Sequence, residues 1–99
     1  MEFNVTILKR ADLEIEEAYL YYESIQNGLG ERFITEYENH LNTLYNVPFF
    51  EQKYDVIRIL PLKKFPYSIH FTVDEINKIV NIQAVICNYQ NPLVTRIKI

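Results

Sequence analysis

The sequence contains little of what marks secreted, membrane-spanning or low-complexity proteins. Its single cysteine, Cys87, excludes an internal disulfide bond. Two glycines and four prolines in 99 residues are too few for a flexible or low-complexity chain. No apolar run approaches the ~20 residues that span a bilayer, and the first residues lack the basic and apolar regions of a signal peptide. We therefore expect one cytoplasmic domain over residues 1–99, with no membrane partner.

Tryptophan is also absent, whereas eight tyrosines and six phenylalanines predict an aromatic core. Charge is unevenly distributed along the chain. Residues 1–52 carry three basic and ten acidic side chains, whereas residues 53–99 carry seven basic and three acidic side chains. This asymmetry predicts one acidic and one basic surface. The basic surface suits nucleic acid or an acidic protein segment. The alternative is that the helices simply carry solvated glutamates, and charge alone leaves both interpretations open.

Two amphipathic helices are predicted, at residues 11–25 and 30–46. Apolar residues recur every three or four positions on one face of each, as expected for a helix packed on a core. These stripes are Ala11, Ile15, Ala18, Tyr22 and Ile25, then Phe33, Tyr37, Leu41 and Leu44. Gly28 suits the left-handed conformation that ends a helix, and the short link predicts an antiparallel helical hairpin. Pro48 ends the second helix.

Strands are predicted at residues 2–8, 54–60, 66–73 and 78–86. The strand at 54–60 is apolar on both faces, as central strands are, and residues 74–77 form the turn of a hairpin. The predicted single-face sets are Tyr67, Ile69, Phe71 and Val73 opposite Ser68, His70 and Thr72, and then Val80, Ile82, Ala84 and Ile86. The order β-α-α-β-β-β predicts an α+β fold, with an antiparallel helical hairpin packed on a mostly antiparallel four-stranded sheet.

Residues that could hold a metal or act as nucleophiles are sparse. His40 and His70 have no second histidine or cysteine at ligand spacing, so no metal site is predicted. Neither a glycine-rich phosphate loop nor a Ser/His/Asp pattern occurs, and no cofactor is predicted. We expect both histidines to be solvated, His70 because it lies on the polar face of its strand. Cys87 is expected to be a buried or half-buried inert thiol.

The remaining candidates are basic or aromatic: Arg58, Lys63, Lys64, Arg96, Lys98, Tyr67 and Tyr89. Arg58 lies in an apolar strand and needs a partner or an open groove. Together the cations form a candidate phosphate-binding patch, and the two tyrosines are candidates to stack on a base beside it. The alternative is that Arg58 pairs with a glutamate while the lysines only keep a turn soluble.

Three ordered segments and one proline are similar to motifs of a known family. Residues 12–23 (DLEIEEAYLYYE) are similar to the motif DIEEAYEWYE, and residues 28–33 (GLGERF) to a GLGERF helix start. Residues 58–69 (RILPLKKFPYSI) are similar to the strand RRFPLKRFPYSI, and Pro92 to the proline of an HxxRDP ending. Over almost its whole length the chain thus resembles the RelE/ParE superfamily of toxins from type II toxin–antitoxin systems, and more closely its ParE-like branch.

The resemblance implies a small cytoplasmic toxin that the C-terminal segment of a cognate antitoxin wraps and neutralises. RelE-type members cleave mRNA in the ribosome, whereas ParE-type members inhibit DNA gyrase and are associated with plasmid stabilization. The RelE nuclease residues are largely missing: the second strand arginine is Ile59, the histidine is Cys87, and the last arginine and aspartate are Gln90 and Asn91. RNA cleavage needs acid–base groups and cations that stabilise a developing phosphorane charge.

We therefore predict a ParE-like toxin that is not an enzyme, binds a protein target (DNA gyrase by resemblance) and is neutralised by its antitoxin. A pI near 5.3 also predicts weak or no direct nucleic-acid binding. The antitoxin would add a helix along the helical hairpin and an extended segment near the sheet. The predicted binding residues are Arg58, Lys63, Lys64, Tyr67 and Arg96. Two alternatives stay open: a ribosome-dependent mRNA endonuclease using Arg58, Lys63, Lys64, Tyr89 and Arg96, and a degenerate non-toxic member that only binds antitoxin.

Overall fold

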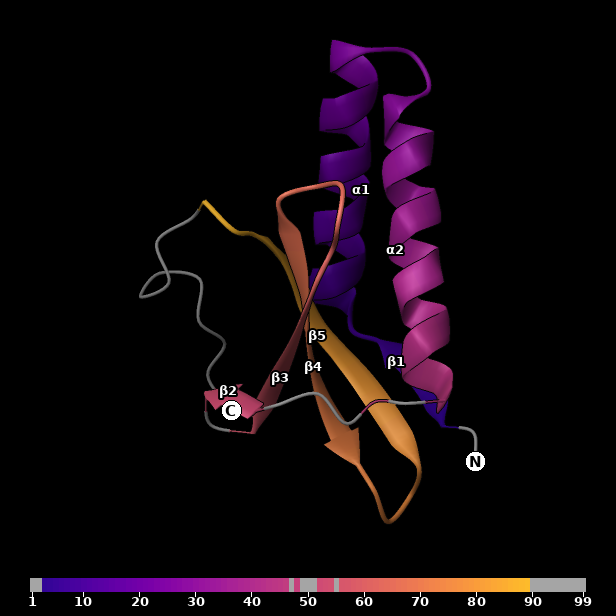
Figure 1. Ribbon diagram of the computed structural model, residues 1–99, viewed down its shortest axis with the longest axis vertical. Coiled ribbons are helices and arrows are strands. Elements are labelled where there is room, and N and C mark those ends of the chain that lie inside the picture. Colours follow the sequence, from indigo (N-terminus) through magenta and orange to yellow (C-terminus); the bar gives the residue numbers. More distant parts are fainter. Residues whose placement is uncertain (1–2, 47, 49–51, 55, 90–99) are drawn as a thin grey trace.

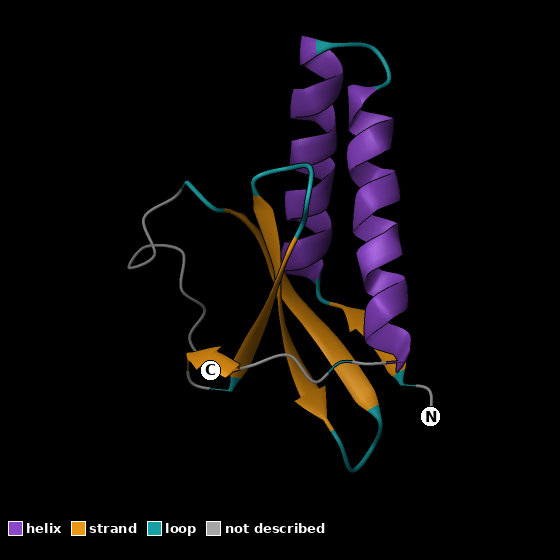
Figure 2. Cartoon of the chain, viewed as in Figure 1, coloured by secondary structure: helices purple, strands orange, loops and turns teal. Residues whose placement is uncertain are grey.

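The computed structural model describes residues 3–46, 48, 52–54 and 56–89. Along the chain the elements are β1 (Asn4–Ile7), α1 (Lys9–Ile25), α2 (Leu29–Asn46), β2 (Gln52–Tyr54), β3 (Ile57–Pro61), β4 (Tyr67–Asp74) and β5 (Ile79–Cys87). Two helices form one layer and the strands the other (Figure 1). Figure 2 shows that the helical hairpin projects beyond one end of the sheet. The predicted α+β architecture is confirmed.

Two glycines shape the tip of the helical hairpin. Gly28 has a φ of +88°, the left-handed geometry predicted for it. Gly30 allows close approach of the helices, because an added Cβ would lie 2.6 Å from the carbonyl oxygen of Tyr19. The Glu23 carboxylate accepts a hydrogen bond from the Gly30 N–H at 2.8 Å. The tip is therefore fixed both by backbone geometry and by a side chain reaching from α1 to the start of α2.

The sheet has five strands in the order β1-β5-β4-β3-β2, with β1 parallel to β5 and the other pairs antiparallel. The prediction of a mostly antiparallel sheet is confirmed. The prediction of a single strand over residues 54–60, and hence of four strands in all, is wrong. The structure instead has β2 and β3 as separate antiparallel strands. Between them Val56 lies in a turn with 47% of its surface exposed. Because this turn residue is apolar, the hydrophobic pattern ran on through the reversal and concealed it.

The prediction that Val80, Ile82, Ala84 and Ile86 share one face of β5 is wrong, because β5 contains a β-bulge. The register slips between His70 and Phe71, which pair with Ala84 and Ile82, so Gln83 is the extra residue. Val80 and Ile82 join the main core as predicted, but beyond the bulge Val85 takes that side. Ala84 and Ile86 instead pack with Ile57 and Ile59 in a second cluster. A one-residue slip moves every later side chain to the other face of the sheet.

The main core lies between the helical hairpin and the sheet. The predicted α2 stripe is confirmed, and Ala11, Ile15 and Ala18 of α1 are buried with it. Ile25 was predicted to complete the α1 stripe, but 56% of its surface is exposed. Ile25 is the last residue of α1, at the end of the hairpin that projects beyond the sheet, so none of the described strands packs against it (Figure 1). None of the described helices is both long and apolar enough to cross a membrane.

Candidate functional site

The turn between β3 and β4, residues 62–66, presents the predicted lysine pair. Leu62 N–H donates to the Tyr67 carbonyl at 2.9 Å and closes the turn. Lys64 N–H donates to the Glu36 carboxylate of α2 at 2.7 Å. Glu36 is 9% exposed, and a buried carboxylate that accepts a backbone N–H fixes the position of that backbone. The side chains of Lys63 and Lys64 are therefore displayed in solvent from a backbone tied to the helical layer.

The sequence alone did not single out Glu36, because it is one of many acidic residues in the two predicted helices. The signal that could have found it is its position within α2, next to Tyr37 and three residues after Phe33, where a solvated glutamate is not expected. A carboxylate on a buried helix face needs a polar partner. That partner comes from the turn, 28 residues further along the chain.

Aromatic rings pack the turn against the two helices. Phe65 lies 4.9 Å from Tyr22 and 5.3 Å from Phe33, centroid to centroid, and Tyr67 lies 5.2 Å from Phe33. These are edge-to-face arrangements, the favoured geometry for aromatic pairs. Burial raises the pKa of the Tyr67 hydroxyl, and the neighbouring Cys87, Tyr21 and Glu17 raise it further. The Tyr67 ring is thus engaged in the core on one side and half-exposed on the other.

An open groove runs between this turn and α2. Its volume is about 640 Å³, and it is lined by residues that include Arg32, Thr35, Glu36, Asn39, Lys64 and Phe65. Arg32, which the sequence analysis did not single out, brings a second cation to the same groove as Lys64. The described lining therefore combines the Phe65 ring with two cations, two carboxylates (Glu31 and Glu36), a hydroxyl and an amide, a composition suited to a polar peptide segment.

The other predicted residues are only partly brought together. Tyr89 is 86% exposed and lies at the same end of the sheet as the lysines, because Asn88 N–H donates to the Pro66 carbonyl at 2.7 Å. Arg58 is half-buried near the start of β3, opposite Phe71. Five residues of extended chain separate it from Lys63, or about 16 Å at roughly 3.3 Å per residue. Arg96 and Lys98 lie outside the described residues, as do Gln90, Asn91 and Pro92.

The histidines and the thiol have different surroundings. His70 was predicted to be solvated, but it is 9% exposed; burial, with a contribution from Arg10, lowers its pKa to about 4. The prediction failed because the second face of the sheet carries its own apolar cluster. His40 is half-buried, with Nδ1 2.8 Å from the Glu36 carbonyl. Cys87 is half-buried as predicted, and no three potential ligands cluster to hold a metal among the residues described.

Solved structures share this architecture. No family model and no curated protein matches the chain. A structure of the chromosomal ParDE toxin–antitoxin system from P. aeruginosa matches with a TM-score of 0.76 and 15% identity, over 87% of this chain and 96% of that one. The RelBE2 toxin–antitoxin complex from Mycobacterium tuberculosis matches with a TM-score of 0.62 and 11% identity, over 88% of this chain and 99% of that one.

The RelE–RelB complex from Pyrococcus horikoshii matches with a TM-score of 0.57 and 12% identity, over 92% of this chain and 100% of that one. Each match extends over most of this chain and nearly all of the chain compared with it, so the similarity covers a whole domain. The chain therefore has the RelE/ParE fold. Among the three, the ParDE structure has the highest TM-score.

Proposed function

We propose that this chain is the toxin component of a type II toxin–antitoxin system, of ParE-like type, and that it acts by binding a protein. The fold supports the class, because the ParDE and RelBE structures that share it are toxin–antitoxin systems or complexes. The observation that carries the proposal is the lysine pair, displayed on a turn that Glu36 anchors and beside an open groove. A rigid charged edge next to a groove suits recognition of a peptide segment.

The first partner under this proposal is a cognate antitoxin. An acidic segment of the antitoxin would lie along the groove, with its carboxylates near Lys63, Lys64 and Arg32. A helix of the antitoxin would pack along the helical hairpin. Arg58, Tyr67 and Arg96 remain proposed contacts, although Arg58 lies at the far end of β3 from the lysine turn.

The proposed target is a protein of the cytoplasm, with DNA gyrase as the candidate that the resemblance supplies. Non-enzymatic action is supported by the residues at the positions of the missing nuclease set. Ile59 packs in the second apolar cluster, and Cys87 is a half-buried thiol at the end of β5. Neither side chain can stabilise the charge that develops on a phosphate during RNA cleavage.

Induction in bacterial cells tests the proposal. The chain alone should arrest growth, and co-expression with the neighbouring reading frame should restore growth and give a complex that co-purifies. Lys63→Glu should weaken that complex by about tenfold, since a reversed charge repels an acidic partner. Lys9→Glu reverses an equally exposed lysine at the start of α1 and should leave it unchanged. Normal growth with no complex would refute the proposal.

A second function has one observation in its favour. Tyr89, highly exposed, lies at the same end of the sheet as Lys63 and Lys64, as a ribosome-dependent mRNA endonuclease would require for base stacking beside phosphate contacts. Mapping of transcript ends after induction separates the two functions. Cleavage phased with ribosomes supports the endonuclease, whereas intact transcripts with inhibited supercoiling by gyrase support the protein-binding toxin. A chain that binds antitoxin without arresting growth would be the degenerate, non-toxic member.

A further inference from the structure

A second hollow lies on the other side of the lysine turn, between α1 and the end of β5. Among the described strands, β1 pairs with β5 over Ile79–Ile82. Beyond Ile82 the edge of β5 that β1 occupied is next to α1. The hollow has a volume of about 230 Å³, and its lining includes Glu14, Glu17, Tyr21, Tyr67 and Cys87. This is below the roughly 300–1,000 Å³ of most small-molecule sites. We call it the Glu17 hollow; it has room for one side chain.

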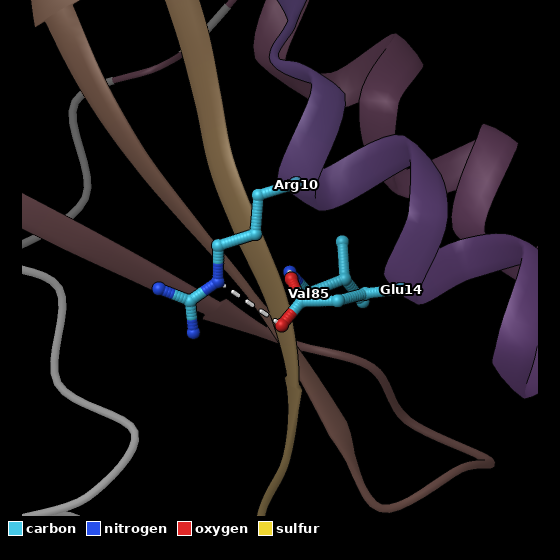
Figure 3. A network of polar contacts seen from close by, with 3 residues as sticks. All are labelled: Arg10, Glu14 and Val85. Atoms are coloured by element: carbon cyan, nitrogen blue, oxygen red, sulfur yellow. Dashed lines mark hydrogen bonds and ion pairs between the residues drawn. The ribbon is translucent and has the colours of Figure 1, made fainter.

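One carboxylate of the hollow is held in place by the fold. Glu14 accepts a hydrogen bond from the Val85 N–H at 2.9 Å and a second from Arg10 Nε at 3.2 Å. Figure 3 shows Arg10 reaching the Glu14 carboxylate, which lies against β5 at Val85. The Val85 N–H faces no described strand on this side of β5, and the Glu14 carboxylate accepts its hydrogen bond instead. Glu14 is thus part of the wall, with its charge largely compensated.

The second carboxylate is not compensated. Glu17 lies one helical turn after Glu14, is exposed, and makes no ion pair with any described residue. The described residues that line the hollow include no lysine or arginine. The described lining therefore carries negative charge, and no three potential metal ligands cluster in the part of the chain that the structure describes.

Aromatic rings complete the walls. Tyr21 is 58% exposed and Tyr67 is half-buried, and both line the hollow. A guanidinium group stacks on aromatic faces and forms paired hydrogen bonds with a carboxylate, whereas an ammonium is a compact point charge that keeps its water. Two tyrosines beside a glutamate that has no ion-pair partner among the described residues therefore favour arginine over lysine.

We propose that the Glu17 hollow binds an arginine side chain of a partner protein, with the guanidinium on the Glu17 carboxylate and its stem along Tyr21 and Tyr67. This surface carries the charge opposite to that of the lysine turn. One hollow lies between that turn and α2, and the other lies between α1 and the neighbouring ends of β4 and β5, where Tyr67 directly follows the turn. A partner segment that crosses the turn would thus meet cations on one side and an arginine receptor on the other. The inference stands whether or not the chain is a toxin.

Nuclear magnetic resonance with the full chain tests the hollow directly. N-acetyl-arginine amide should shift the amide resonances of Val85 and Cys87 in a saturable way, and N-acetyl-citrulline amide, of the same shape but uncharged, should not. Glu17→Gln should weaken binding by roughly threefold, the size of one partly exposed ion pair. Glu16→Gln removes an equally exposed charge outside the hollow and should leave binding unchanged.

Each other outcome overturns the proposal. Equal shifts with citrulline amide would show that charge plays no part. Equal weakening by Glu16→Gln would show diffuse attraction to an acidic helix. N-acetyl-lysine amide binding as well as the arginine compound would refute the guanidinium assignment. If no shifts are localised at Val85 and Cys87, the hollow is not a receptor for a cationic side chain.

Discussion

Acidification should destabilise the fold through His70. This side chain is buried on β4, with Ile59 and Ala84 as its register partners on either side. Its pKa falls from 6.5 to about 4 because burial disfavours the charged form and Arg10 adds a like charge. At about 1.4 kcal/mol per pH unit, this difference corresponds to about 3 kcal/mol of unfolding free energy.

The direction follows from proton binding in the two states. Between pH 6.5 and about pH 4 the unfolded chain binds a proton on His70 and the folded chain does not. The unfolding free energy therefore falls as the pH is lowered through this range, and the contribution of His70 is complete above pH 6.5. We expect the wild type to lose about 3 kcal/mol more than His70→Gln between pH 7 and pH 4.

Urea unfolding followed by far-ultraviolet circular dichroism at each pH measures the difference, since the chain has no tryptophan to report by fluorescence. Comparing the two proteins cancels the carboxylates that titrate in both. Parallel curves for the wild type and His70→Gln would refute the account, because they would mean that His70 is protonated equally in both states.

Three further substitutions test the packing around the candidate site. Tyr37→Phe should be neutral or stabilising by up to about 1 kcal/mol in urea unfolding, because the buried Tyr37 hydroxyl has no hydrogen-bond partner among residues 3–46, 48, 52–54 and 56–89; a loss of stability above that size would reveal a partner elsewhere in the chain. Glu36→Ala should cost about 2 kcal/mol by leaving the Lys64 N–H unpaired, and hydrogen exchange at Lys64 should accelerate; unchanged exchange would contradict the anchoring role. Gly28→Ala should cost about 1 kcal/mol from its φ of +88° alone, since an added Cβ meets nothing within 4 Å; an equal cost for Asn27→Ala would point to another cause.

The sequence predicted those parts of the fold that depend on local pattern. Helix periodicity and the glycine link located the hairpin, and the alternation in β4 located its faces, because these signals depend only on neighbouring residues. The bulge at Gln83 could not be predicted, since a slip of one residue depends on how β4 and β5 pair. The burial of His70 was missed for the same reason, because the second apolar cluster forms only after Ala84 and Ile86 change face.

The candidate site was predicted less well than the fold. The Lys63–Lys64 turn was identified from its residues, but its anchor Glu36 and the neighbouring Arg32 come from a helix far away in sequence. Arg58 was grouped with the lysines because it precedes them closely in the chain. An extended strand carries charges apart by about 3.3 Å per residue, so closeness in sequence did not become closeness in space.

The parallel pairing of β1 with β5 has a consequence for how the chain acquires its shape. The first described strand to be synthesised pairs only with the last, and contacts so distant in sequence form late because closing the loop costs entropy. The helical hairpin, built from neighbouring segments, can form early. A nascent chain that has not reached Ile79 offers β1 no strand partner, and α1 still lacks β5, one of the strands on which it packs. The Glu17 hollow, which needs both α1 and the end of β5, therefore forms only after the chain has been synthesised as far as Cys87.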